Sequence, residues 1–280
     1  MDRNQEQKGP LVLDLHAILR KRMPRKISRL VPDMVISWLA CLIRQDELNE
    51  ILRVTYPHRG STFSRKVLDH LGITVDVYGL DRLPEGGRFM FASNHPLGGL
   101  DGISLIAVLG ERYGDDGIRF VVNDMLMNVE PLRDVFIPVN KFGTQRREAA
   151  TAMNETLASA MHVLQFPAGL VSRLGKDGKI ADLEWQKAFV TKAIEYERDI
   201  VPIHFIGMNT PRFYKTARWR KRMGLKINLE QALLPSEVCK AKGSHYTVIF
   251  GEPISWQKLK ESKRSVKELA AEIKERVYNL

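Results

Sequence analysis

The amino-acid sequence predicts an α/β protein in which helices flank a largely parallel central sheet, with a helical extension at the N-terminus. From residue 73 onward, short apolar runs of strand length alternate with longer segments of helical periodicity. Before residue 73 the apolar positions recur at helical spacing. With 280 residues, 44% of them hydrophobic and 27% charged, the chain can build one large core and does not have the composition of a disordered protein.

The first 72 residues predict four successive helices. Apolar side chains at helical spacing mark residues 11–19, 31–43, 46–52 and 61–71. The rest of the chain has the rhythm of an α/β unit without an internal repeat or a low-complexity linker. We therefore expect a helical N-terminal region at residues 1–72 and one α/β domain at residues 73–280.

Seven strands and six helices are predicted within residues 73–280. The expected strands are residues 73–78, 88–92, 118–122, 135–139, 163–166, 200–206 and 246–250. The expected helices are residues 102–112, a short one at 125–134, and 146–161, 185–198, 213–222 and 266–277. Strands that alternate with helices favour parallel pairing, and active-site groups of such proteins gather where the strands end.

Charge and cysteine content narrow the classes of partner and cofactor. The formal net charge of +10 suits anionic lipid, an acidic carrier protein or nucleic acid. Cys41 and Cys239 cannot form a disulfide framework or a thiolate zinc site, and a reducing compartment fits them best. His204 and His245 have no metal-ligand spacing, so we expect no metal and no resident cofactor.

The sequence favours a protein that lies on a membrane without crossing it. Its start has no apolar segment behind a basic one, which argues against a signal peptide. The longest apolar run, residues 34–43, is well short of the roughly 20 residues that span a bilayer. Basic residues precede the helix that contains Trp38, a pattern shared by interfacial helices and by helices that cap a core.

A second interfacial candidate lies at residues 212–226. Its aromatic residues stand among cations: Phe213, Tyr214 and Trp219 with Lys215, Arg218, Arg220, Lys221, Arg222 and Lys226. This composition suits the headgroup region of a membrane, although a nucleic-acid surface or a solvated helix face would share it. We favour a membrane or an acidic acyl carrier over nucleic acid, and we expect a cytoplasmic protein on the inner face of the cell membrane.

The segment from Ser93 to Asp101 is the most informative part of the chain. A predicted strand leads into Asn94 and His95, and Gly98 and Gly99 precede Asp101 at the start of a predicted helix. A histidine can act as a general base near neutral pH, and a carboxylate can fix its tautomer and stabilise the imidazolium. The alternatives are that Asp101 is only the N-cap of residues 102–112 and that His95 is a turn residue.

This segment resembles the first motif of the glycerolipid (lysophospholipid) acyltransferase family, N-H-x-x-x-x-D, in which His is the base and Asp supports it. Three later stretches resemble the other motifs in the required order. They are residues 137–141 (Ile-Pro-Val-Asn-Lys), residues 166–172 (Phe-Pro-Ala-Gly-Leu-Val-Ser) and residues 201–203 (Val-Pro-Ile). The resemblance covers about residues 75–255 and identifies the chain as a divergent member.

The chain departs from the family at three places. Five residues separate His95 from Asp101 where the family has four, and a bulge at the two glycines could absorb the additional one. Lys141 stands where the second motif has Arg, which loses the two-pronged grip on a phosphate. Ala168 replaces the glutamate of the third motif. These changes suggest an acceptor other than glycerol-3-phosphate, such as a lysophospholipid or a lyso-aminolipid.

The resemblance implies an O-acyltransferase that moves a fatty acyl group from acyl carrier protein or acyl-CoA to a lipid hydroxyl. His95 and Asp101 would be catalytic, and backbone N–H groups near Gly98 and Gly99 could stabilise the oxyanion. The candidate substrate-binding residues are Asn140, Lys141, Gly169, Ser172 and Arg173. The alternatives are a membrane-binding protein that keeps the fold without turnover and, more weakly, a hydrolase, which lacks a G-x-S-x-G nucleophile.

Overall fold

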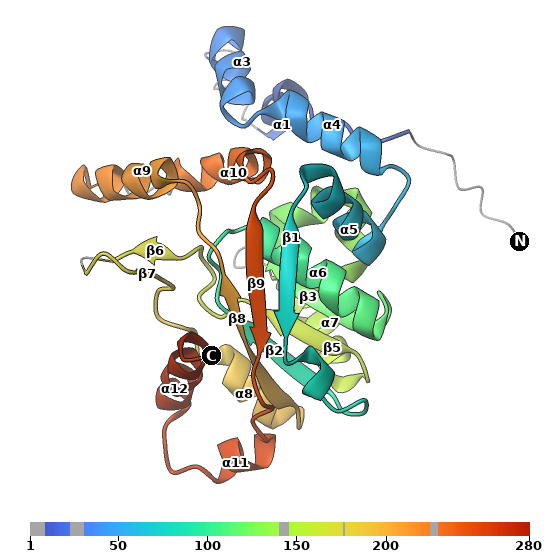
Figure 1. The fold of residues 1–280 in the computed structure, drawn as a ribbon, viewed down its shortest axis with the longest axis vertical. Helices are drawn as coiled ribbons and strands as arrows, with labels where there is room; N and C mark the ends of the chain where they lie inside the picture. The colour runs from blue at the N-terminus through green and yellow to red at the C-terminus, as the bar shows by residue number, and fades with distance from the viewer. Residues whose placement is uncertain (1–8, 23–30, 140–145, 176, 225–228) are drawn as a thin grey trace, which may run out of the picture.

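A seven-stranded, mostly parallel sheet forms the centre of the molecule (Figure 1), as predicted. The computed structural model describes residues 9–22, 31–139, 146–175, 177–224 and 229–280. Within them the strand order is β1-β9-β8-β2-β5-β3-β4. The strands are β1 (Thr74–Tyr78), β2 (Phe89–Ser93), β3 (Ile118–Asn123), β4 (Phe136–Val139), β5 (His162–Gln165), β8 (Asp199–Ile206) and β9 (His245–Phe250).

Five neighbouring strands, from β8 to β4, are parallel to one another, whereas β9 is antiparallel to β8 and pairs with β1 in parallel. The carboxyl ends of β2, β5 and β8 therefore meet at one edge of the sheet, where the loops that contain the first and third predicted motifs follow β2 and β5.

Helices cover both faces of the sheet because the strand residues alternate between the two faces. Phe89 and Phe91 of β2 belong to the core that contains α5 (Gly60–Leu71) and α6 (Leu100–Tyr113). Met90 and Ala92 belong to the core on the other face, with α8 (Ala188–Glu195) and α12 (Val266–Tyr278). The remaining helices are α7 (Arg146–Ala158), α9 (Pro211–Arg222), α10 (Leu234–Lys240) and α11 (Trp256–Glu261).

Four helices precede the first strand in the described part of the chain, as predicted: α1 (Leu15–Arg22), α3 (Asp33–Leu42), α4 (Gln45–Thr55) and α5. Of these, α5 packs into the main core through Val67, Leu68 and Leu71. The segment before α1 is held to α4, because Asn49 accepts the N–H of Leu13 at 2.7 Å and donates to its carbonyl at 3.0 Å. The division into two parts at residue 72 stays a prediction.

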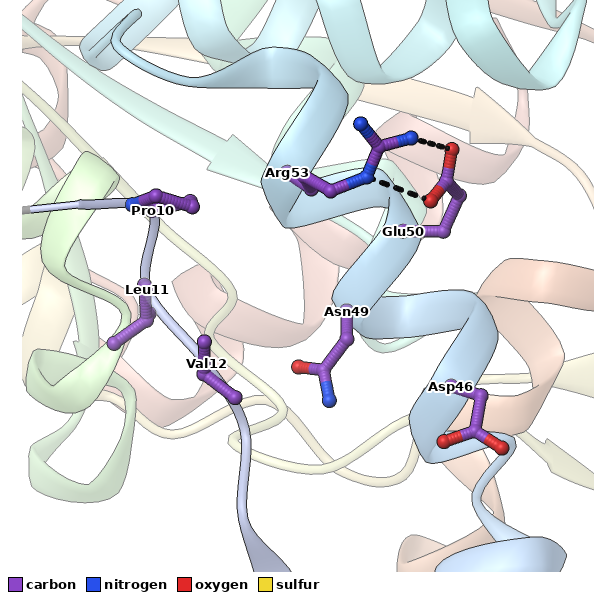
Figure 2. A pocket seen from close by; sticks show the side chains of 7 residues that line it. All are labelled: Pro10, Leu11, Val12, Asp46, Asn49, Glu50 and Arg53. Carbon is purple, nitrogen blue, oxygen red and sulfur yellow. Dashed lines mark hydrogen bonds and ion pairs between the residues drawn. The ribbon is translucent and has the colours of Figure 1, made fainter.

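A hollow of about 250 Å³ lies between this N-terminal segment and α4 (Figure 2). Figure 2 shows Leu11 and Val12 on one side and Asn49 and the Arg53–Glu50 ion pair on the other. The lining residues belong to none of the predicted motifs. We assign the hollow to the packing of the N-terminal segment.

The structure differs from the predicted elements at several ends. Two 3-10 helices, Asp124–Asn128 and Glu130–Val135, replace the helix expected at residues 125–134, and Pro131 lies at the start of the second. The helix expected at residues 185–198 spans only Ala188–Glu195. The hairpin of β6 (Arg173–Leu174) and β7 (Ile180–Ala181) and the short helices α10 and α11 were not predicted.

Candidate active site

The loop that follows β2 is fixed to the neighbouring strand by Asn94. The buried Asn94 side chain accepts the N–H of Phe205 at 2.7 Å and donates to the Phe205 carbonyl at 2.9 Å. An amide is suited to this role because it offers a donor and an acceptor together. Asn94 therefore ties the end of β2 to β8, and His95 follows directly at the carboxyl edge of the sheet.

His95 and Asp101 lie in direct contact. His95 Nδ1 is 2.9 Å from Asp101 Oδ2, and the Asp101 side chain is completely buried. The same oxygen accepts the N–H groups of Leu97 at 2.9 Å and Gly98 at 3.2 Å. A carboxylate with these donors accepts the Nδ1–H, which leaves Nε2 as the basic nitrogen of the imidazole.

The alternative that Asp101 is the N-cap of the helix is wrong. Helix α6 begins at Leu100 with Gly99 as its N-cap, so Asp101 lies within the first turn. Its Oδ1 accepts the neighbouring N–H of Gly102 at 2.9 Å, and its Oδ2 points back to the loop. The carboxylate closes the loop rather than capping the helix.

The additional residue between His95 and Asp101 is accommodated at Gly98. Its φ of +78° is in the left-handed region, which glycine enters without a steric penalty. A Cβ at Gly98 would stand 2.5 Å from Val171 Cγ2 and 3.0 Å from the methyl carbons of Leu234. The glycine therefore allows both the turn and the close packing that bring Asp101 to His95.

Burial and ion pairing set the pKa values of the pair in opposite directions. Burial alone would lower the pKa of His95, but the charge and hydrogen bond of Asp101 outweigh it, so the pKa is raised. Burial would raise the pKa of Asp101, and the His95 interaction and the two backbone donors reverse this and lower it. The pair is therefore an ionised carboxylate beside an imidazole of increased basicity.

The third predicted motif packs against the first. Ser172 N–H donates to the His95 carbonyl at 2.8 Å, and the Phe166 ring stacks on the His95 ring with their centroids 4.0 Å apart. Gly169 is exposed, with a φ of +64° and open space where a Cβ would lie. Ala168 is buried in the core beneath this turn.

Asp182 is a residue of the site that the sequence did not single out. Its side chain is 5% exposed. It accepts hydrogen bonds from the His95 N–H at 3.2 Å, the Ser172 hydroxyl at 2.6 Å and the Trp185 indole N–H at 2.9 Å. A lone aspartate 87 residues from His95 carries no local signal. The hydroxyl of Ser172, a predicted substrate contact, is buried and engaged by Asp182.

Arg173 belongs to a buried cluster of charges beside the loop. Its Nη2 lies 2.9 Å from Glu230 Oε1, and Arg220 Nε lies 2.8 Å from the other carboxylate oxygen. Glu230 is completely buried and was not predicted. Burial lowers the pKa of Arg173, and its guanidinium lies over the Phe213 ring at 5.6 Å. Two cations share one anion, so the cluster has a local charge of about +1.

Two other predicted contacts cannot be placed. Asn140 and Lys141 lie outside the described residues, directly after β4. Gly98 N–H donates to Asp101, so it is engaged within the loop. Gly99, the other predicted oxyanion or loop residue, is the N-cap of α6.

Within the described residues no group of three or more His, Cys, Asp or Glu side chains could hold a metal ion.

Helix α9 begins near the site and presents cations to solvent. Asn209, just before it, donates to the carbonyls of Pro96 and Leu97 at 3.2 Å. Phe213 and Tyr214 of the expected aromatic belt are buried, whereas Trp219 is 55% exposed among basic residues. In Figure 1, α9 and α10 lie near α1, α3 and α4 at one end of the molecule. None of the described helices has the length and apolar character needed to traverse a bilayer.

Comparisons with known proteins identify the chain's relatives as acyltransferases. A family model described as an acyltransferase matches residues 17–280. A lyso-glycine lipid O-acyltransferase of Phocaeicola vulgatus is 39% identical over 269 residues, which cover 96% of this chain and 95% of that protein. One of the same description from Bacteroides thetaiotaomicron is 38% identical, with coverage of 96% and 97%.

A solved structure is also similar, the 1-acyl-sn-glycerophosphate acyltransferase PlsC from Thermotoga maritima. It is 15% identical, with a TM-score of 0.46 and coverage of 91% of this chain and 97% of that one. The family match and the two relatives confirm the resemblance that the motifs indicated, and they remove the alternatives of a silent protein and a hydrolase. The chain therefore belongs to the acyltransferase family, and it is an O-acyltransferase.

Proposed function

We propose that this enzyme transfers a fatty acyl group from a thioester to the hydroxyl of a lyso-glycine lipid. The observation that carries the proposal is the His95–Asp101 contact of 2.9 Å in a chain 39% identical to a lyso-glycine lipid O-acyltransferase. The departures from the glycerol-phosphate motifs support the choice of acceptor. Lys141 in place of Arg loses the two-pronged grip on a phosphate, and Ala168 stands where the family has a glutamate that helps to hold its polar acceptor.

In this mechanism His95 is the general base. Its Nε2 takes the proton of the acceptor hydroxyl, and the oxygen attacks the thioester carbonyl to give a tetrahedral intermediate. The intermediate collapses with cleavage of the carbon–sulfur bond, and the imidazolium returns the proton to the leaving thiolate. Asp101 holds Nδ1–H and stabilises the imidazolium in between.

The oxyanion needs donors that the protein does not already use. Leu97 and Gly98 N–H groups donate to Asp101. The N–H of Gly102 in the first turn of α6 also donates to Asp101. We therefore assign the oxyanion to the N–H groups of Gly99 and Leu100 at the start of α6, where the helix dipole favours negative charge.

We assign recognition of the acceptor headgroup to the Arg173 cluster. A glycine attached to a lipid through its amine keeps a carboxylate, which the local charge of about +1 beside the His95 loop would attract. Gly169, with open space above it, allows the acceptor to approach the backbone. Asn140 and Lys141 remain proposed contacts for the polar part of the acceptor.

The donor is proposed to be acyl carrier protein or acyl-CoA, and the enzyme is proposed to work at the inner face of the membrane. Two features support a peripheral location. Helix α3 buries Ile36 and leaves Met34 and Trp38 exposed, at 79% and 62%. Helix α9 exposes Trp219 among cations. Apolar side chains beside basic ones suit an anionic lipid surface.

The test is an acyl-transfer assay with labelled acyl carrier protein and labelled acyl-CoA in separate arms. We expect lyso-glycine lipid to be acylated at least tenfold faster, as kcat/KM, than lysophosphatidate or glycerol-3-phosphate. Replacement of His95 by Ala should abolish the transfer with either donor. If glycerol-3-phosphate is the best acceptor, the proposed acceptor is wrong, and if H95A remains active, the proposed base is wrong.

A matched pair of variants tests the headgroup assignment. Arg173→Met removes the local positive charge and leaves Glu230 paired with Arg220. It should raise the KM for lyso-glycine lipid about tenfold with little change in kcat. Arg65→Met, which removes a cation paired with Glu111 on the surface, should leave the KM unchanged. Equal KM values for the two variants would contradict the role of Arg173.

A further inference from the structure

Asp182 connects the His95 loop to two parts of the chain that are distant in sequence. Its carboxylate accepts three hydrogen bonds, from His95 N, Ser172 Oγ and Trp185 Nε1. Its backbone joins the C-terminal helix α12, since its N–H donates to the Tyr278 hydroxyl at 2.8 Å and its carbonyl accepts Lys274 Nζ at 2.7 Å. The Asp182 side chain is 5% exposed, so these hydrogen bonds replace the water that would surround a carboxylate at the surface.

The position of the His95 backbone depends on this residue. The His95 N–H is bound by Asp182, and the His95 carbonyl is bound by Ser172 N–H, whose own hydroxyl is bound by Asp182. The Asp182 carboxylate thus holds the His95 N–H directly and the His95 carbonyl through Ser172. Asp101 then orients the ring, so the ring and the backbone of His95 are held by two different carboxylates.

We propose that Asp182 is a positioning residue for the reaction, which fixes the backbone of His95 and adds a second negative charge behind the imidazolium. The inference rests on the proposed role of His95 as general base. Asp182 does not touch the reacting atoms in this assignment. It acts through His95, as groups behind a catalytic side chain commonly do.

The charges around the two residues are consistent with this role. Asp101 of α6 and Asp182 both favour the protonated imidazole, and Arg173 of β6 opposes it. Burial raises the pKa of Asp182, and the hydrogen bonds from Ser172, Trp185 and the His95 backbone and the nearby His95 ring offset this only in part, so the pKa is raised. Lys274 of α12 donates to the backbone carbonyl of Asp182. Burial lowers the pKa of His204 of β8, and the charge of Asp182 acts in the opposite direction.

The first variant for the test is Asp182→Asn, made in the full-length chain. The amide oxygen can still accept from His95 and Ser172, but the charge is lost and the NH2 group faces the Trp185 indole N–H. The double variant D182N with Trp185→Phe removes the indole N–H, so that two donors no longer face each other. It serves as the test if this contact alone prevents D182N from folding. We expect both to lower kcat about tenfold to a hundredfold, with less than about a twofold change in the acceptor KM.

The pH dependence separates positioning from folding. The acid limb of kcat/KM against pH reports the pKa of the free base. Loss of the Asp182 charge should move this limb to lower pH. Ser172→Ala keeps the charge and removes one donor, so it should lower kcat without moving the limb.

Asp115→Asn is the matched structural control. Asp115 also binds a distant segment, since its two oxygens lie 3.0 and 3.1 Å from the N–H of Ser61 at the start of α5. It should lower the melting temperature and leave kcat and the acid limb unchanged. If D182N and the double variant behave like D115N, the inference is overturned.

The variant H95A in the same assay tests the proposed general base. If H95A remains active, the proposed function fails. If H95A is inactive and D182N has normal activity, only the role of Asp182 is contradicted.

Discussion

At the scale of single residues, Gly98 decides whether the His95 loop can close on Asp101. Its left-handed φ and the 2.5 Å approach of Val171 leave no room for a side chain. We predict that Gly98→Ala shifts the loop, breaks the N–H donation to Asp101 and lowers kcat at least tenfold. The strain should also reduce the free energy of unfolding by about 1–3 kcal/mol. Steady-state kinetics and denaturant titration measure both effects.

The neighbouring glycine provides the control. A Cβ at Gly99 would lie 3.5 Å from Val238, which is an ordinary contact. Gly99→Ala should therefore lower stability far less than Gly98→Ala. Equal losses for the two variants would show that the turn at Gly98 is not what closes the loop.

The second prediction at this scale concerns the pH dependence of the reaction. Because the neutral form of His95 is the proposed base and its pKa is raised, activity should increase with pH through a value above the ordinary histidine pKa of about 6.5. Asp101→Asn removes the charge that raises the pKa. Its acid limb should move to lower pH, and kcat should fall a hundredfold or more. If the acid limb of the pH profile stays at the same pH in D101N, the Asp101 charge does not raise the pKa of His95 and the prediction is wrong.

The sequence predicted the residues that follow one another in a motif and missed those that the fold brings together. His95 and Asp101 are six positions apart, and a family pattern covers both. Asp182 and Glu230 are single acidic residues in segments without a pattern, and their partners His95 and Arg173 are distant in sequence. Pairing across such distances depends on the sheet topology, which spacing along the chain does not encode.

At the scale of elements, helices α7 and α8 are shorter than the periodicity of the sequence predicts. Residues 185–187 have helical spacing but precede α8, because the Trp185 indole is bound to Asp182. Helix α7 ends at Ala158 instead of residue 161. Arg198 donates hydrogen bonds to backbone carbonyls in its last turn and just after it. Strands of two residues, as in β6 and β7, are too short to have a period at all.

Arg198 supplies the prediction for this scale. It is completely buried and donates to the carbonyls of Thr156, Leu157, Ser159 and Met161, at 2.6–3.1 Å. Burial lowers its pKa to about 10, so it stays charged at neutral pH and balances the negative end of α7. Arg198→Lys keeps the charge but has too few donors, and we predict a loss of about 3 kcal/mol in the free energy of unfolding.

The comparison for Arg198 is a half-buried cation on helix α8, Lys192. Lys192→Arg on α8 should change the stability by less than about 0.5 kcal/mol, since its ion pair with Glu195 is at the surface. Denaturant titration of both variants checks the difference. Comparable losses would mean that the carbonyls at the end of α7 do not depend on the guanidinium.

At the scale of the whole molecule, the order of the strands places the proposed catalytic pair, His95 and Asp101, beside the cationic helix α9. Parallel strands β2 and β8 end at the same edge of the sheet, so the His95 loop and α9 begin side by side. The sequence predicted this sheet because the alternation of strands and helices is a long-range pattern. It did not predict that Phe213 and Tyr214 face inward, because helical periodicity does not say which face meets the core.

This arrangement predicts salt-sensitive binding to lipid at the α9 end of the molecule. The protein should sediment with vesicles of anionic phospholipid at about 0.1 M salt and be released near 1 M, where the Debye length falls from about 10 Å to about 3 Å. Vesicles of neutral lipid should bind it weakly. The double variant Lys221→Glu and Arg222→Glu, on the exposed end of α9, should weaken binding to anionic vesicles at least tenfold.

Helix α11 provides the control, because two cations can be replaced by two glutamates there as well. Lys258 and Lys260 are exposed there, and Figure 1 shows α11 at the end of the molecule opposite to α9. Lys258→Glu with Lys260→Glu alters the net charge as much as the α9 variant does. If net charge alone attracted the protein to lipid, both double variants would lose binding equally, and the assignment to α9 would be wrong. Loss in the α9 variant alone would place the membrane surface beside the carboxyl edge of the sheet, where a lipid acceptor could reach His95 without leaving the interface.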